Sequence, residues 1–227
     1  MNWFEFLENF FIVLLVIAIV SLIVGGITLS ILYENKRKQK LKELAEEMGL
    51  SFVPDGDPHL LARFSDFKLF NVGRSRKMRN LIQGDSGEVK LAIFEYAYTT
   101  GGGKNSKTHR QSVVSLHSND LVCPDFTIRP ENFLDRIGSA LGFQDIDFDD
   151  HEEFSSKFVL QGSNEQQVRE YFNRETLDFF TARPDICVEA QSGTLFYYRT
   201  NKRINPNQIK DSLAEAYEVF GMMVDHQ

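Results

Sequence analysis

The sequence predicts an α+β protein in which one N-terminal transmembrane helix precedes a soluble domain with a mostly antiparallel sheet, packed helices and possibly two pseudo-repeated halves. Three observations lead to this prediction. An uncharged apolar run covers residues 10–32, strand-like segments come in hairpin pairs, and helical segments separate the pairs. At 227 residues, the chain is long enough for one anchor and one domain with an ordinary core.

The apolar run is the first element. Residues 10–32 are rich in Ile, Val and Leu, and as a helix they rise about 34 Å, enough to cross a hydrocarbon core of about 30 Å. A buried core helix is disfavoured because soluble domains rarely hold a helix of this length that is apolar on every side. A cleaved signal peptide is disfavoured by the acidic start, the long apolar core and the lack of a small-x-small cleavage site.

The charges around this run predict its direction. Five cations follow it within ten residues: Lys36, Arg37, Lys38, Lys40 and Lys42. No cation precedes it, so the positive-inside rule predicts an outer N-terminus and a cytoplasmic C-terminal domain. The same five side chains are predicted to contact anionic lipid headgroups. The predicted organisation is a short outer N-terminus (1–9), a span (10–32), a basic juxtamembrane helix (33–48) and a soluble domain (49–227).

Periodicity and turn residues predict the elements of the domain. Strands are expected at residues 50–53, 67–72, 80–83, 89–99, 109–117, 126–128, 158–160, 186–190 and 194–199. Helical segments are expected at residues 59–64, 130–141, 165–172, 175–181 and 206–222. The segment 89–99 carries large side chains on both faces and is therefore predicted to be a central strand covered on both sides.

A short similarity suggests an internal duplication. Residues 64–69 resemble residues 154–159 with one residue inserted, and each segment precedes a hairpin with Ser-Gly in its turn. Two half-sheets related by pseudo-symmetry would produce this similarity, and so would chance in a chain with 20 phenylalanines.

The sequence contains no catalytic signature and favours a non-enzymatic role. The five histidines form neither an HExxH motif nor part of a nucleophile elbow. Asp145, Asp147 and Asp149 open like a calcium loop, but the glycine and glutamate that complete such a loop are missing. The glycines before Lys104 lack the flanking residues of a phosphate-binding loop. No catalytic residue, cofactor or metal site is therefore predicted.

The charge of the chain limits the classes of partner that its soluble domain is expected to bind. The net charge is −7, and the part after residue 42 carries −9, which disfavours nucleic-acid binding. Within this acidic part, four cations stand in six residues: Arg74, Arg76, Lys77 and Arg79. They are the candidate site for a phosphate, an anionic lipid surface or an acidic protein partner. The alternative is a solvated loop neutralised by carboxylates of the domain.

Three segments, residues 80–84, 93–98 and 111–114, resemble a pattern found in uncharacterised bacterial membrane proteins. These proteins join N-terminal transmembrane segments to a soluble α+β domain of unknown function. The resemblance implies a location in the bacterial inner membrane and carries no functional residue to this chain.

Three functions remain open from the sequence. The first is a membrane-tethered cytoplasmic domain that binds a protein partner or the inner leaflet. The second is an enzyme with a nonstandard site that acts on a phosphate-bearing lipid or nucleotide near Arg74–Arg79. The third is a small-ligand sensor with an aromatic pocket made by Tyr96, Tyr98, Tyr197 and Tyr198.

Overall fold

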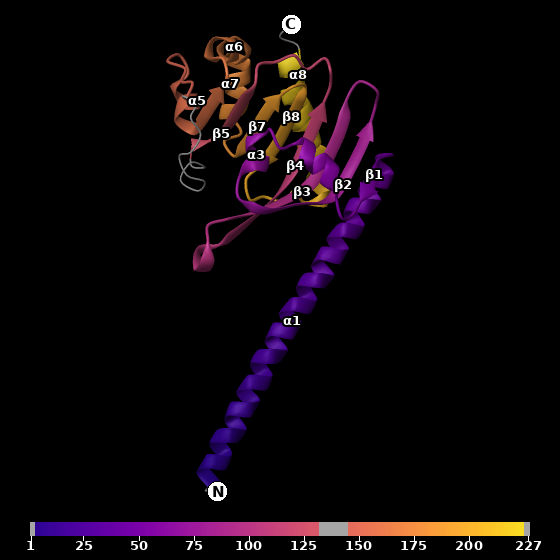
Figure 1. Cartoon of the computed structure of the whole chain (residues 1–227), viewed down its shortest axis with the longest axis vertical. Helices are drawn as coiled ribbons and strands as arrows, with labels where there is room; N and C mark the ends of the chain where they lie inside the picture. The colour runs from indigo at the N-terminus through magenta and orange to yellow at the C-terminus, as the bar shows by residue number, and fades with distance from the viewer. Residues whose placement is uncertain (1–2, 132–144, 225–227) are drawn as a thin grey trace.

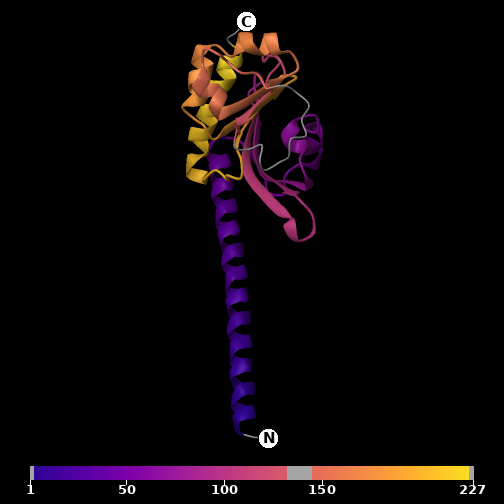
Figure 2. The same ribbon diagram turned by 90° about the vertical axis from the view of Figure 1, so that its left-hand side faces the viewer.

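The computed structural model describes residues 3–131 and 145–224 of the chain. A long helix, α1 (Trp3–Glu47), carries an α+β domain at its C-terminal end (Figure 1). The domain is built on an eight-stranded antiparallel sheet with helices on both of its faces (Figure 2). This architecture confirms the predicted fold class.

The strands lie in the order β1-β2-β3-β4-β8-β7-β5-β6, and each pair of neighbours is antiparallel. Their bounds are β1 Ser51–Val53, β2 Arg74–Asp85, β3 Lys90–Thr100, β4 Lys107–His117, β5 Phe126–Pro130, β6 Phe158–Gly162, β7 Ile186–Gln191 and β8 Thr194–Arg199. The β4–β8 pair joins a half made of β1 to β4 to a half made of β5 to β8. From each edge of the sheet inward, the strand order is β1-β2-β3-β4 in the first half and β6-β5-β7-β8 in the second. The two halves therefore have the same number of strands, but their two outer strands are arranged in opposite chain order.

The first face of the sheet packs against the C-terminal part of α1 and against four further helices (Figure 2). These are α5 Glu152–Lys157, α6 Glu165–Tyr171, α7 Arg174–Thr181 and α8 Ile209–Val224, the last preceded by the short helix η3 Pro206–Gln208. Ala216, Val219 and Met223 form a fully buried stripe on α8 at helical spacing. The predicted C-terminal helix is thus an amphipathic cover of the sheet.

The second face is covered by α2 (Pro58–Arg63) and α3 (Lys68–Asn71) (Figure 2). An aromatic cluster fills the space beneath them. Phe64 and Phe70 meet the ring of Phe196 on β8 at centroid distances of 4.7 and 4.9 Å, with the edge-to-face geometry that aromatic pairs favour. Strand β3 contributes Ile93 to the first core and Phe94 to the second, which confirms that it is a central strand covered on both sides.

The segment 67–72, expected as a strand, contains the helix α3, so that prediction is wrong. Leu69 and Phe70 are both buried, and a helical turn allows adjacent residues to face the same layer, whereas a strand would send them to opposite faces. The carboxylate of Glu189 also accepts the Leu69 N–H at 3.0 Å from the sheet below. The helix expected at 130–141 lies outside the described residues beyond Glu131.

Strand β2 starts six residues earlier than predicted. Its first half contains the cations of residues 74–79, so this segment is not a loop. Register shifts flank Lys77 and Arg79, and Ser75 and Asn80 have positive φ angles of 54° and 48°. Such bulges twist an edge, and β1 pairs only with residues 81–83 of β2, which leaves 74–79 unpaired on one side.

Candidate functional site

The apolar part of α1 has no cover from the domain. Its large apolar side chains between Phe10 and Tyr33 are 46–77% exposed. Among the described residues, α1 is the helix that is long and apolar enough to cross a membrane. A surface of this size and apolarity is unfavourable in water and favours a lipid environment. This apolar part of α1 therefore supports a membrane anchor and does not belong to the core of the domain.

Beyond Glu34, α1 becomes part of the domain. Leu41 and Ala45 are buried in the first core at 2% and 0% exposure. The guanidinium of Arg37 is also buried. Its Nε donates to Oε1 of Glu95 on β3 at 2.5 Å, and its Nη2 donates to the backbone oxygen of Ile204 at 2.6 Å. The helix is therefore held by apolar and ionic contacts at once.

A second guanidinium completes an ion-pair cluster of Glu34, Arg37, Glu95 and Arg203. The guanidinium of Arg203 donates two hydrogen bonds of 2.6 and 2.7 Å to the carboxylate of Glu34, and its Nη2 lies 2.9 Å from Oε2 of Glu95. Asn80 on β2 donates to the other oxygen of Glu95. Hydrogen bonding from Arg203 lowers the pKa of Glu34. The alternating charges join α1, β2, β3 and the segment after β8, and they fix the angle at which α1 leaves the sheet.

The structure separates the five cations that follow the apolar run. Lys36, Lys38, Lys40 and Lys42 are exposed, as a contact with headgroups requires. Arg37 is buried in the ion-pair cluster and is not available for lipid. Sequence alone gives no sign of this difference, because the partners of Arg37 lie 58 and 167 residues away.

The four candidate anion-binding cations are exposed along the first half of β2. Arg74 donates to the backbone oxygen of Gly101 and, at 3.0 Å, to the Ser106 hydroxyl. Arg76 donates to backbone oxygens before the strand, including that of Asn71 at 2.6 Å. These bonds hold neighbouring loops in place, and neither arginine forms an ion pair within the described part of the chain.

The sheet register adds three more cations that sequence reasoning did not single out. Lys77 and Arg110 are both paired with Ala97, so they flank β3, and the β3–β4 hairpin carries Lys104 and Lys107. We name the whole group the basic rim: Arg74, Arg76, Lys77, Arg79, Lys104, Lys107 and Arg110. Glu95 is the carboxylate of this part of the sheet, and it is already bound by two arginines. The β3–β4 hairpin, which carries Lys104, Lys107 and Arg110 of the rim, projects from the same side of the domain as the apolar part of α1 (Figure 1).

The four tyrosines of the sensor hypothesis do not form one pocket. Tyr96, Tyr98 and Tyr198 lie on the second face, whereas Tyr197 belongs to the first core. All four are at most 3% exposed. Tyr197 donates its hydroxyl hydrogen to Glu215, across the sheet from the others. The aromatic-pocket hypothesis is therefore wrong, because adjacent residues of β8 point to opposite faces.

The acidic run and the histidines serve structural contacts. Ile146 is buried, and Asp145 accepts the backbone N–H groups of Ile146 and Leu160. Burial raises the pKa of Asp145. His109 and His117 each hydrogen-bond to hydroxyl or amide partners of neighbouring segments. In the described parts of the chain, no three His, Cys, Asp or Glu side chains converge as metal ligands would.

The chain thus combines an α+β domain with an exposed apolar helix that supports a membrane anchor. No family model matches the chain, and no curated protein matches it. Among solved structures, the fold is similar to the crystal structure of the mycobacterial trehalose monomycolate transport factor A, TtfA, with a TM-score of 0.61 and 13% sequence identity. The match covers 82% of this chain and 93% of that chain. At this identity, the similarity shows a shared fold.

Proposed function

We propose that this chain is a single-pass protein of the bacterial inner membrane, with its N-terminus outside and its α+β domain in the cytoplasm. The exposed apolar length of α1 supports the span. The exposed lysines that follow residue 32 support the direction, because cations are retained on the cytoplasmic side. The resemblance to bacterial membrane proteins supports the compartment.

The proposed role is that of an accessory factor whose domain rests on the cytoplasmic leaflet and binds anionic headgroups through the basic rim. One observation carries this proposal: seven cations gather at one end of the sheet in a domain whose charge is −9, and the β3–β4 hairpin at that end projects from the side of the domain where the apolar part of α1 leaves it. A cation near an anionic leaflet contributes about 1 kcal/mol, and this attraction fades beyond about 10 Å. The ion-pair cluster holds the rim in place, because it fixes the domain to the anchor.

The similarity to TtfA supports a non-enzymatic part in transport. That protein is named a transport factor, and the two folds correspond over most of both chains. We propose that this chain also assists the movement of an envelope component. In that role the fixed orientation of the domain matters more than any reaction, because a factor of this kind positions other molecules at the membrane.

The leaflet contact can be tested on the full chain in lipid nanodiscs. A fluorophore sensitive to polarity is attached to Asn105→Cys at the hairpin tip, in a background with Cys123→Ser. With discs that contain phosphatidylglycerol, the emission should shift to the blue and be quenched by lipid-borne quenchers. With phosphatidylcholine alone, both effects should be small, because surface attraction needs anionic lipid. The control label is Ser86→Cys, at the opposite end of β3.

Charge reversal sharpens the test. Lys104→Glu with Lys107→Glu should remove the blue shift at position 105 without changing the signal at position 86. Equal spectra in both lipid mixtures for the unchanged rim would refute the leaflet contact. In that outcome a protein partner is the remaining hypothesis, and crosslinking in native membranes through the same position would identify it. The direction of the chain has its own test: a C-terminal alkaline phosphatase fusion should be inactive.

A further inference from the structure

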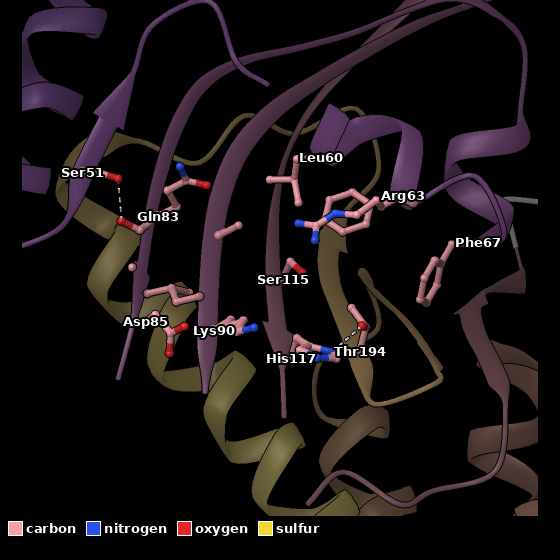
Figure 3. Close-up of a pocket in the computed structure, with 14 residues that line it drawn as sticks. Ser51, Leu60, Arg63, Phe67, Gln83, Asp85, Lys90, Ser115, His117 and Thr194 are labelled. Atoms are coloured by element: carbon pink, nitrogen blue, oxygen red, sulfur yellow. Dashed lines mark hydrogen bonds between the residues drawn. The ribbon is translucent and has the colours of Figure 1, made fainter. Parts of the chain in front are cut away.

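A pocket of about 520 Å³ opens on the second face of the sheet, at the opposite end of β3 and β4 from the basic rim (Figure 3). Its roof is α2 with the residues at its end, and its floor is formed by β2, β3, β4 and β8. The volume lies within the range of about 300–1,000 Å³ that is usual for small-ligand sites. The pocket does not depend on the function proposed above.

The sheet register arranges the floor of the pocket in two rows. The inner row consists of Gln83, Ala92 and Ser115, which are cross-strand partners. The outer row consists of Asp85, Lys90, His117 and Thr194, which are also paired across the strands. Residues two apart on a strand share a face, so both rows face the pocket. His117 and Thr194 are hydrogen-bonded to each other at 2.9 Å.

The pocket exists because two residues of its floor are small. Ala92 precedes Phe94 on the same face of β3, and Ser115 is paired with Phe196. The surface of the sheet therefore drops from the aromatic cluster to a low floor. The apolar side chains of α2 and the ring of Phe67 line the inner wall, whereas the outer row is polar. The pocket is thus apolar at one end and polar at the other.

Several polar groups around the pocket lack partners among the described residues. The residue Ser115 lines the floor of the pocket, and its hydroxyl makes no hydrogen bond with them. Arg63 on α2 and Lys90 on β3 are exposed and form no ion pair with them. Asp85 accepts the backbone N–H of Gly87. Figure 3 shows the guanidinium of Arg63 above the strands, with Ser115 and Lys90 below it.

Charge and polarity together select the ligand. Two cations, Arg63 of the roof and Lys90 of the outer row, line the pocket against one carboxylate, and the Ser115 hydroxyl on its floor can donate to a ligand oxygen. We infer that the pocket binds an anionic amphiphile, with its carboxylate or phosphate between Arg63 and Lys90 and its apolar chain against Leu60, Phe64 and Phe67. The Ser115 hydroxyl donates to an oxygen of the headgroup.

The test uses the full chain in phosphatidylcholine nanodiscs and a long-chain fatty acid with a diazirine on its chain. After illumination, mass spectrometry should find label in residues 58–67 and 83–92. Label in the apolar part of α1 comes from the bilayer and serves as the internal reference. Dodecyl phosphate should reduce the pocket label about tenfold relative to α1, as expected for competition at one site. Uncharged dodecyl maltoside should leave the pocket label unchanged.

Two further outcomes would overturn the inference. If inorganic phosphate displaces the label as well as dodecyl phosphate does, the site binds a free anion and the apolar chain contributes nothing. If dodecyl maltoside displaces it equally, the headgroup charge contributes nothing.

Matched variants assign the site. Arg63→Ala with Lys90→Ala should lower the pocket label about tenfold, because charge-assisted bonds to the headgroup are lost. Arg174→Ala, an exposed cation on α7 over the first face of the sheet, should have no effect. Ser115→Leu fills the floor and should also abolish the label. Because Ser115 is buried, the label of this variant counts only if its Tm equals that of the unchanged protein. If the two Tm values differ, the variant with both cations replaced decides the test. Unchanged label in the cation variant would refute the site.

Discussion

Replacing Glu95 by glutamine tests whether the ion-pair cluster fixes the anchor helix to the domain. Glutamine keeps the shape of the side chain and can still accept a hydrogen bond, but it removes the negative charge between Arg37 and Arg203. In the variant, Arg37 keeps the backbone oxygen of Ile204 and the oxygen of the glutamine side chain as its acceptors. Its buried guanidinium would then have no directly bonded carboxylate, with Glu34 left as the nearby negative charge.

The magnitude follows from burial. The side chains of Arg37 and Glu95 are 5% and 14% exposed, and breaking a buried pair of this kind costs about 3–5 kcal/mol. Arg203 is 21% exposed and keeps its bonds to Glu34, so its share of the loss is small. We expect a loss near the lower end, about 3 kcal/mol. In a domain of this size, that loss lowers Tm by about 6–12 °C.

The assay is thermal unfolding of the full chain in nanodiscs, followed by near-ultraviolet circular dichroism. Hydrogen exchange of residues 34–47 reports the same event locally, because α1 beyond Glu34 should open more often in the variant. The control is Glu47→Gln, which breaks the 2.7 Å pair between α1 and Lys210. Those two side chains are 64% and 54% exposed, so this change should cost about 0–1 kcal/mol.

A role of the cluster in holding the domain is contradicted if Glu95→Gln lowers Tm no more than Glu47→Gln does. Equal exchange of residues 34–47 in both variants would contradict it as well. In either case the angle of α1 would depend on apolar contacts such as that of Leu41.

Three further results are expected. Burial raises the pKa of Glu189 above its ordinary 4.5, so its contribution to stability is present below that pH and falls as pH rises; Glu189→Gln should flatten the fall in Tm between pH 5 and 8. Gly73 has φ +67°, and a Cβ there would lie 2.5 Å from a backbone oxygen of β3, so Gly73→Ala should cost about 2 kcal/mol or more by urea unfolding, whereas Gly102→Ala should change little because nothing lies within 4 Å. Burial raises the pKa values of Cys123 and Cys187 to about 11 and about 12, so iodoacetamide at pH 7.5 should alkylate the partly exposed Cys123 slowly in the folded protein and the buried Cys187 only after unfolding.

The hairpins were predictable because their signals are local. The signals of a hairpin are alternating apolar residues and a Ser-Gly turn, and they lie within about a dozen residues of each other. The observed bounds of β3 and β8 are therefore close to the predicted ones. The segment 67–72 was mispredicted for the opposite reason. Its apolar residues fit a strand, and the contact that favours the helical turn comes from Glu189, 120 residues away. The local sequence pattern gives no indication of a contact with a residue so distant in the chain.

The candidate cations also differ in whether local sequence or only the fold brings them together. Arg74 to Arg79 were visible as a cluster in the sequence, but their place on an edge strand was not. Lys104, Lys107 and Arg110 are separated from them by about thirty residues and join them only through the register of β3 with its two neighbours. Of these three, Arg110 lies on an arm of the predicted hairpin, and Lys104 and Lys107 lie in its predicted connection, so a search that included the connection would have found them.

The sequence by itself determined that this protein has an apolar helix of membrane-spanning length, a basic flank after it and an acidic α+β domain with paired strands. These properties depend on composition and on periodicities within a few residues. The tertiary structure decided which cation is buried against Glu95, which cations share a rim, and that Ala92 and Ser115 lie side by side beneath Arg63. The physical reason is that burial, ion pairing and pocket shape arise between residues distant in the chain, and only the folded sheet sets those distances.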